Sequence, residues 1–251
     1  MRHLLSNIFL LIICLSSFAA KADNSLQLSA GLSFWSSTPD GSFGQTADSV
    51  LTLDKKSGVQ YNYYFTLEHQ VKFVPNVKFS QTTTSNESSS TLSQTFLFND
   101  NLFRVASVLD VESTYEQFDV ITYFEVLDTR TFEFDLGMTL RQHSIHNQVA
   151  NQSDSSESTF SKISDIELLA FVAGKLNLPL LNVGMFVETS FLDTSTYDIQ
   201  TGISYAVYKT ELVETYLQFG VKKQNLEFTN LDGVYTQLNW QAMFIGMEAH
   251  F

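Results

Sequence analysis

The chain has 251 residues, of which 44% are hydrophobic and 14% aromatic, and its formal net charge is −13. The excess of 27 acidic over 14 basic residues argues against a nucleic-acid partner. Cys14 is the only cysteine. Because it falls in a segment that we expect to be removed, disulfides and thiolate metal sites are excluded from the mature protein.

The first segment, Met1–Ala22, has the three parts of a secretory signal peptide. Arg2 and His3 form a basic start, Ile8–Leu15 forms a short apolar core, and Ala20–Ala22 is a small-x-small cleavage site. The apolar core is too short to cross a bilayer as a helix. We therefore expect a signal peptide over residues 1–22 and one exported domain over residues 23–251.

Alternating apolar residues begin directly after this segment. Leu26–Trp35 and Val59–His69 each place apolar or aromatic side chains at every second position, with polar side chains between them. A period of two is typical of a β-strand, since successive side chains point to opposite faces. The polar stretch Ser36–Gly58 between them carries the turn signal Pro39-Asp40-Gly41 and predicts a long connection.

A third strand starts near Val77 and is predicted to end in Thr82–Ser90, which is nearly all Ser and Thr. Leu92–Phe98 and Leu102–Leu109 then flank the turn Asn99-Asp100-Asn101 and predict a hairpin. This hairpin could belong to a loop, or its arms could be two further strands of the sheet.

The clearest alternation follows in Tyr115–Leu127 and Thr131–Gln142. In the second of these, a face of Phe132, Phe134, Leu136, Met138 and Leu140 opposes a face with three ionisable residues, Glu133, Asp135 and Arg141. A wet lumen behind a lipid-facing stripe explains such a strand.

His143–Lys162 is predicted to be a long polar loop, and Lys223–Leu238 another connection. Strands are predicted over Ile166–Leu176, Val183–Phe191, Tyr197–Val207 and Val213–Lys222. Long connections therefore alternate with short ones, as in outer-membrane barrels with short periplasmic turns and long external loops.

The last strand, Asn239–Phe251, resembles the terminal strand of bacterial outer-membrane β-barrels. Met243, Ile245, Met247 and the terminal Phe251 lie at alternate positions. The resemblance implies that the barrel-assembly machinery reads these residues as its signal.

These patterns predict an all-β fold, a transmembrane antiparallel up-and-down β-barrel of ten strands, with twelve or eight as alternatives. Ten is preferred because Leu109–Thr114 has no turn residues with which to end a strand. Ten and twelve both return the C-terminus to the periplasmic side.

Several stretches resemble a family of small outer-membrane barrels from marine and related gammaproteobacteria. They are Ala30–Gly44 (AGLSFWSSTPDGSFG), Tyr64–Ser80, Thr91–Asp100 and Asp119–Leu140. The resemblance covers most of the mature chain and little of His143–Lys162. It implies fold and outer-membrane location, and it brings no catalytic residue, because the family has no assigned function.

The inward faces of the predicted strands collect charged residues. The lumen candidates are Glu68, Asp119, Glu133, Asp135, Arg141, Lys175, Glu188, Glu214, Lys222 and Glu248. Opposite charges across a narrow lumen would pair and plug it, which favours a packed ion-pair network over a cation-favouring pore.

Three residues could carry chemistry at the external rim: His143, Ser144 and His146. A Ser-His pair with an acid is the arrangement of a hydrolase, and a rim enzyme acting on lipid or lipopolysaccharide is one alternative function. Solvated loop histidines are the favoured interpretation, so no catalytic residue, metal site or cofactor is assigned.

Trp35 and Trp240, with tyrosines such as Tyr61 and Tyr63, are predicted to anchor the barrel at the membrane interfaces. The expected function is a monomeric outer-membrane protein with a structural, adhesive or narrow-pore role. Its expected partners are outer-membrane lipid and lipopolysaccharide. A secreted soluble β-sandwich that binds a ligand is the remaining alternative.

Overall fold

The computed structural model describes residues 26–37, 40–46, 49–52, 58–99, 101–231 and 234–251. The predicted signal peptide, residues 1–22, lies outside the described residues. No helix in the described part of the chain is long and apolar enough to span a bilayer. The helical structure that it contains is one 3₁₀ turn, η1 (Pro179–Leu181).

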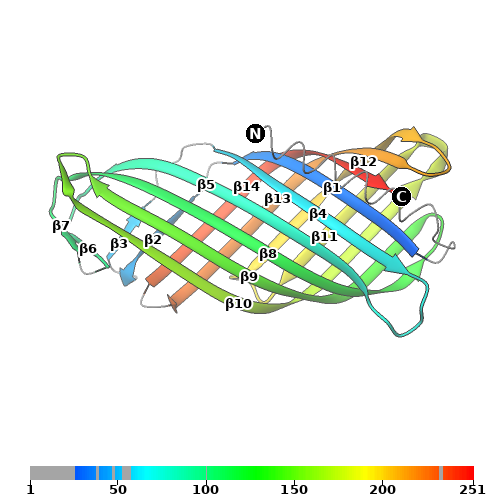
Figure 1. Cartoon of the computed structure of the whole chain (residues 1–251), viewed down its shortest axis with the longest axis horizontal. Coiled ribbons are helices and arrows are strands. Elements are labelled where there is room, and N and C mark those ends of the chain that lie inside the picture. Colours follow the sequence, from blue (N-terminus) through cyan, green and yellow to red (C-terminus); the bar gives the residue numbers. More distant parts are fainter. Residues whose placement is uncertain (1–25, 38–39, 47–48, 53–57, 100, 232–233) are drawn as a thin grey trace.

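Ten antiparallel strands close into a barrel (Figure 1). In ring order they are β1 (Leu26–Ser37), β4 (Gly58–His69), β5 (Asn76–Thr91), β8 (Val108–Asp128), β9 (Phe132–Asn151), β10 (Asp154–Leu178), β11 (Val183–Phe191), β12 (Tyr197–Lys209), β13 (Glu214–Leu231) and β14 (Val234–His250). The ring closes between β1 and β14, with a register that runs from Ser29↔His250 to Trp35↔Phe244. The soluble sandwich is therefore wrong, and the predicted ten-stranded barrel is confirmed.

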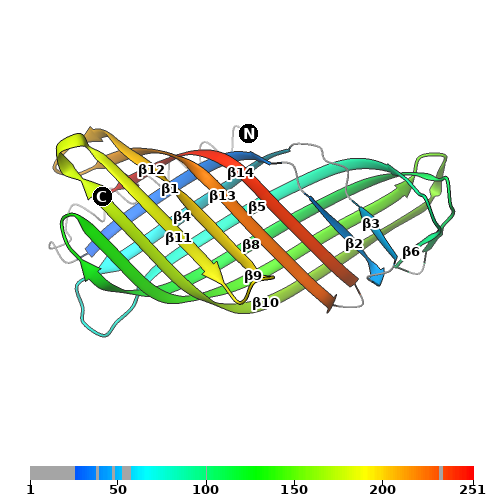
Figure 2. The ribbon, with the colours of Figure 1, turned by 180° about the vertical axis from the view of Figure 1, so that it is seen from behind.

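The two ends of the barrel differ. One end carries Leu26, His250 and the short turns that follow β4, β8, β10 and β12, and we call it the termini end. The other end carries two small hairpins, β2 (Asp40–Thr46) with β3 (Ser49–Thr52), and β6 (Phe96–Phe98) with β7 (Asn101–Phe103), and we call it the hairpin end (Figures 1 and 2). β2 adds to the side of β14, whereas β6 and β7 form a separate two-stranded sheet. The hairpin predicted around Asn99 is thus not part of the barrel wall.

Alternation along β9 assigns its two faces as the sequence predicted. Phe132, Leu136, Met138 and Leu140 are 41–54% exposed and point outward, whereas Thr139 and Arg141 are at most 1% exposed. From Leu140 toward the hairpin end, the outward positions become polar, beginning with exposed Gln142. A bilayer needs about 9–11 residues of a tilted strand, so the 20 residues of β9 continue well beyond this apolar belt.

Three predicted connections are wrong because they are β-structure. Thr82–Ser90 lies within β5, His143–Lys162 covers the ends of β9 and β10, and Lys223–Leu238 covers the ends of β13 and β14. The Ser- and Thr-rich half of β5 pairs residue by residue with β8, up to Thr91↔Val108. Pairing with the neighbouring strand satisfies the backbone hydrogen bonds of these polar residues, even though Asn among them has a low intrinsic preference for strands. In Ser36–Gly58, also predicted to be a connection, β2 and β3 form a hairpin.

The two tryptophans face the interior, so their predicted role as interface anchors is wrong. Trp35 and Trp240 are each 5% exposed. Trp35 packs against Ala242 and Phe244, and the Trp240 ring stacks on Tyr115 with centroids 5.1 Å apart. Each tryptophan lies an even number of positions from inward-facing residues of its own strand, so the prediction assigned it to the wrong face of the sheet. Tyr61 and Tyr63 do point outward, with 42% and 53% exposure.

Candidate functional site: the closed lumen

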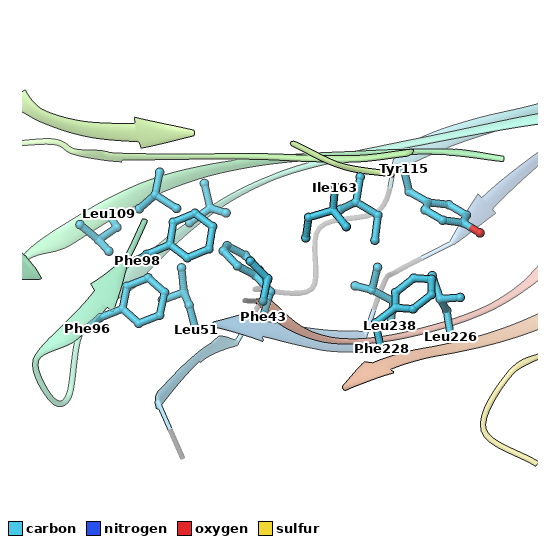
Figure 3. Close-up of a cluster of buried hydrophobic side chains, with 14 of the residues drawn as sticks. Phe43, Leu51, Phe96, Phe98, Leu109, Tyr115, Ile163, Leu226, Phe228 and Leu238 are labelled. Carbon is cyan, nitrogen blue, oxygen red and sulfur yellow. The ribbon is translucent and has the colours of Figure 1, made fainter. Parts of the chain in front are cut away.

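The interior at the hairpin end is filled by one cluster of buried side chains, which we call the aromatic core (Figure 3). The hairpin β6–β7 supplies Phe96, Phe98 and Phe103, each at most 2% exposed. The β2–β3 hairpin adds Phe43 and Leu51 from the opposite side. The barrel strands complete the core with Leu109, Val111, Tyr115, Ile145, Val149, Ile163, Leu226, Phe228, Val234, Leu238 and Trp240, and Leu92 joins it from the connection before β6.

Rings of the aromatic core contact one another directly. Phe43 meets Phe98 edge-on with centroids 5.1 Å apart, and Phe96 stacks on Phe98 at 5.8 Å. Such pairs contribute about 0.5–1.5 kcal/mol each beyond their buried area. A packed interior leaves few voids larger than a water molecule, and these side chains fill the interior at this end of the barrel.

Beneath the aromatic core, a hydrogen-bonded layer crosses the barrel, and we call it the polar crossbar. It consists of Tyr115, Gln117 and Asp119 from β8, Arg141 and His143 from β9, and Gln224 from β13. Gln224 Nε2 donates to Gln117 Oε1 at 2.6 Å. Because β8 and β13 lie on opposite sides of the ring, this bond joins opposite walls.

Arg141 forms the strongest contacts of the polar crossbar. Its Nε and Nη2 donate to the two carboxylate oxygens of Asp119 at 2.8 and 2.9 Å, and Nη2 also donates to Asp198 of β12. Arg141 is 1% exposed and Asp119 4%. A bidentate guanidinium–carboxylate pair with a second acid satisfies most of the donors that burial would otherwise leave unpaired.

Toward the termini end, the lumen opens into a cavity of about 630 Å³, which we call the inner cavity. It reaches the short turns, since its walls include His69, Thr129 and Pro179. Acidic side chains outnumber basic ones in its lining. The acids are Glu68, Asp119, Glu125, Asp128, Glu133, Asp135, Glu188, Asp198 and Glu248, and the bases are Lys78, Arg130, Arg141, Lys175, Lys209 and Lys222.

Contacts across the inner cavity narrow it further. Lys78 of β5 donates to both oxygens of Glu188 on β11, at 2.8 and 2.6 Å. The Tyr64 hydroxyl donates to Glu248, passing over Gly31 of the strand between them. A Cβ at position 31 would lie 2.2 Å from Cζ of Tyr64, so only glycine leaves room for this ring.

The ten predicted lumen charges lie in two places in the barrel. All except Glu214 line the inner cavity. Glu214 lies at the termini end, where it accepts from Tyr216 and pairs with Lys209. Lys175 lies 3.8 Å from Glu133, and Lys222 lies over the ring of Trp35, with Nζ 4.8 Å from its centroid.

The three rim candidates do not form one site. His143 faces the interior and is 1% exposed, whereas Ser144 and His146 belong to the outward face of β9. The expectation of solvated loop histidines is therefore wrong for His143. Ser144 Oγ and His146 Nε2 are 3.4 Å apart on the outside, and a side chain two residues along a strand necessarily shares its face.

His143 instead links the polar crossbar to an acid. Its Nδ1 lies 2.7 Å from the Tyr115 hydroxyl, and its Nε2 lies 2.8 Å from Glu167 Oε2 of β10. This acid–imidazole–hydroxyl series is sealed beneath Trp240 and Phe228, which contact Tyr115 and His143 by their rings. Since no substrate could reach the buried Tyr115 hydroxyl, the series is a structural contact rather than a nucleophile with its base.

Sequence reasoning did not identify Tyr115, Gln117 and Gln224 as site residues. The alternation of β8 could have identified the first two of them, because Tyr115 and Gln117 lie two positions apart on the same inward face as Asp119, together with Val111 and Ser113. Among the described residues, no group of three or more His, Cys, Asp or Glu is arranged to hold a metal ion.

Comparison with known proteins gives the fold and no family. No protein-family description and no curated protein sequence matches this chain. Among solved structures, it is similar to the outer membrane protease OmpT from Escherichia coli, with 8% identity, a TM-score of 0.53, and coverage of 93% of this chain and 100% of that one. Ail of Yersinia pestis also matches, with 12% identity, a TM-score of 0.41, and coverage of 90% and 99%. At 8% identity, the similarity to OmpT supports the outer-membrane β-barrel fold alone.

Proposed function

We propose that this protein is a closed outer-membrane β-barrel that does not conduct solutes and that anchors a β-structured outer half at the cell surface, in a structural or adhesive role. The observation that carries the proposal is the double closure of the lumen by the aromatic core and the polar crossbar. A pore needs a continuous wet path, and here the Gln117–Gln224 bond and the Phe43–Phe98 contact lie across it. A narrow pore is therefore the less favoured role.

The outer-membrane location is supported by three independent features. The described barrel carries an apolar belt, exemplified by Leu136 and Met138, its fold is similar to outer-membrane barrels, and residues 1–22 have the pattern of a secretory signal. The termini end would then face the periplasm and the hairpin end the outside. Membership of the gammaproteobacterial barrel family that the sequence resembles is part of this proposal.

We expect the protein to fractionate with outer membranes and to migrate faster on a gel before boiling than after it. A folded barrel resists detergent at room temperature and stays compact, which gives this shift in mobility. Recovery in the soluble periplasmic fraction, with no shift, would contradict the proposal.

Among the partners, we propose that outer-membrane lipid and lipopolysaccharide surround the belt and that the barrel-assembly machinery recognises the last strand. Met243, Ile245 and Met247 support this, since they point outward with 52–79% exposure. The backbone N–H of Phe251 donates to Leu28 O at 2.8 Å, which joins the final residue to the first strand.

Deletion of Phe251 should slow assembly sharply, because it removes both the aromatic signal and the last bond of the β1–β14 seam. A pulse-chase experiment that follows the folded, fast-migrating form measures this rate. Phe251→Tyr is the matched control and should assemble close to the wild-type rate. Equal rates for the deletion and the wild type would contradict the role of this residue.

A hydrolase at the external rim is not proposed. The arrangement of His143, Ser144 and His146 on two faces gives it no support, and the similarity to a protease at 8% identity concerns the fold.

A further inference from the structure

One stretch of β10 has an edge that the rest of the barrel does not cover. β10 pairs with β11 only from Ala170↔Phe191 to Leu178↔Val183, although its pairing with β9 extends to Ser158. β11 and β12 are short, and the turn after β11 ends them below the level of the hairpin end (Figure 2). A notch therefore opens in the wall between the outer part of β10 and the outer part of β13.

Hydrogen bonds within the turn and to β13 hold the turn that bounds the notch. The carboxylate of Asp193 accepts from the Ser195 hydroxyl and from the backbone N–H groups of Ser195 and Thr196. These bonds lower the pKa of Asp193, since they favour its charged form. Leu192 N also donates to Thr196 O. The turn is also joined to β13, since Asn225 Nδ2 donates to Ser195 O at 2.7 Å, and among the described residues it makes no hydrogen bond to the outer part of β10.

Two hydrogen bonds identify which residues of β10 face the notch. Asn177 N donates to Thr131 O, on the β9 side, whereas Phe160 O accepts from Asn99 Nδ2 of the β6–β7 hairpin, on the other side. The β9–β10 register is unbroken from Ser158 to Leu176, and both backbone groups of a residue in an antiparallel strand point the same way. Even-numbered residues therefore direct N–H and C=O into the notch.

Those residues are Lys162, Ser164, Ile166 and Leu168, and we call this stretch the β10 edge. No backbone or side-chain group of the described residues bonds to their backbone N–H or C=O on the notch side. Ile166 and Leu168 are 62% and 57% exposed, at the outer margin of the apolar belt. Open sheet edges are costly next to lipid, because nothing there bonds to them.

The side chains beside this edge indicate the charge of an occupant. Asp165 and Glu167 point to the interior side of the notch, where Glu167 bonds to His143 and Asp165 forms no ion pair with any of the described residues. Across the notch, β13 continues past Asn225, the last residue that β12 pairs. The gap lies where the two intervening strands, β11 and β12, have ended. Asp165 is the inward-facing acid beside it that no ion pair of the described residues occupies, and Lys162 is exposed on the outward side.

We propose that the β10 edge is a docking site for an extended basic segment of a partner protein, which adds to β10 as an antiparallel strand. Main-chain bonds to Lys162–Leu168 would supply affinity, and a lysine or arginine over Asp165 would supply selectivity. This inference rests on the proposed surface-anchoring role and gives that role a partner class.

A second copy of the chain fits this edge poorly. Two copies in one membrane have the same orientation, so a two-fold axis along the membrane normal keeps both β10 strands running in the same vertical sense. With strands tilted by about 35–45°, the two edges would then cross rather than pair as antiparallel neighbours.

Fluorescence anisotropy with peptide probes tests the proposal, using the full mature protein in lipid nanodiscs. The first probe is a nine-residue peptide of alternating valine and lysine, which presents lysine in either register. The second replaces lysine by glutamate, and the third carries N-methyl groups on alternate amides, which block strand addition. We expect the first probe to bind at least tenfold more tightly than either of the other two.

Matched variants locate the binding. Ser164→Pro removes an N–H from the β10 edge, where proline is tolerated, and should weaken binding at least tenfold, whereas Ser164→Ala should stay within twofold of wild type. Asp165→Asn should weaken binding about fivefold, and the outward-facing Asp110→Asn should not change it. The mobility shift on heating verifies that each variant folds.

Four results would overturn the proposal: equal binding of the N-methylated peptide, equal binding to Ser164→Pro and Ser164→Ala, equal binding of the glutamate peptide, or peptide-free dimers that vanish in Ser164→Pro. Binding in detergent but not in nanodiscs would also overturn it, since lipid would then occupy the edge. None of these results bears on conductance, so failure here leaves the closed-barrel proposal standing.

Discussion

Leu136→Arg should prevent most of the protein from inserting into the outer membrane. Leu136 lies in the middle of the outward stripe of β9 and is 41% exposed. If this face contacts hydrocarbon, an arginine near the midplane has no partner and costs about 2–4 kcal/mol. Quantifying the fast-migrating folded form in outer-membrane fractions measures the effect.

The neighbouring Asp135→Asn is the control, since its side chain points into the inner cavity. Removing a charge there should leave assembly close to wild type. A one-residue slip would exchange the two faces and reverse the order of effects. Normal assembly of Leu136→Arg together with failure of Asp135→Asn would show that the inside–outside assignment is wrong.

Arg141→Ala should be the most damaging change inside the lumen. It leaves Asp119, at 4% exposure, and the carboxylate of Asp198 without the guanidinium that they share. Breaking a buried pair by removing one partner costs about 3–5 kcal/mol. Urea unfolding followed by tryptophan fluorescence measures this loss, because Trp35 and Trp240 are both buried.

Arg104→Ala provides the matched control, because it deletes the same side chain at an exposed position outside the barrel wall. Its free energy of unfolding should stay within about 0.5 kcal/mol of wild type. Asp119→Asn should cost less than Arg141→Ala, since Asp198 remains as a partner for the arginine. Equal unfolding free energies for Arg141→Ala and wild type would contradict a structural role for the polar crossbar.

The barrel was predictable because a strand with one lipid-facing side carries its period in the sequence. Phe132–Leu140 alternate without interruption, and the structure exposes the apolar members. A hairpin around Asn99 was also predicted from its turn residues and apolar arms, with its place in or out of the wall left open and ten strands preferred; the structure places it outside the wall, although the end of its predicted second arm, Val108–Leu109, belongs to β8.

The outer half of the barrel was not predictable from local pattern. Thr82–Ser90 and His143–Lys162 are polar on their outer faces and were interpreted as loops, but they extend β5, β9 and β10. Their strand conformation comes from pairing with β8 and with each other, which no single stretch encodes. The aromatic core has the same origin, since Phe43, Phe96 and Phe98 meet barrel residues distant in sequence.

The position of His143 could have been deduced. Arg141 was correctly assigned to the lumen, and a residue two positions later points the same way. The change from an apolar to a polar outer face at Gln142 was instead interpreted as the end of the strand. In a strand that leaves the membrane, the outer face changes chemistry while the inner face continues.

Planar-bilayer recording of the purified folded protein tests the central claim most directly. If the aromatic core and the polar crossbar close the lumen, insertion should add no stepwise current above the bare bilayer at voltages that leave the bilayer intact. Stable, single-sized conductance steps that scale with salt concentration would mean that ions pass the Gln117–Gln224 level, and they would contradict a closed barrel.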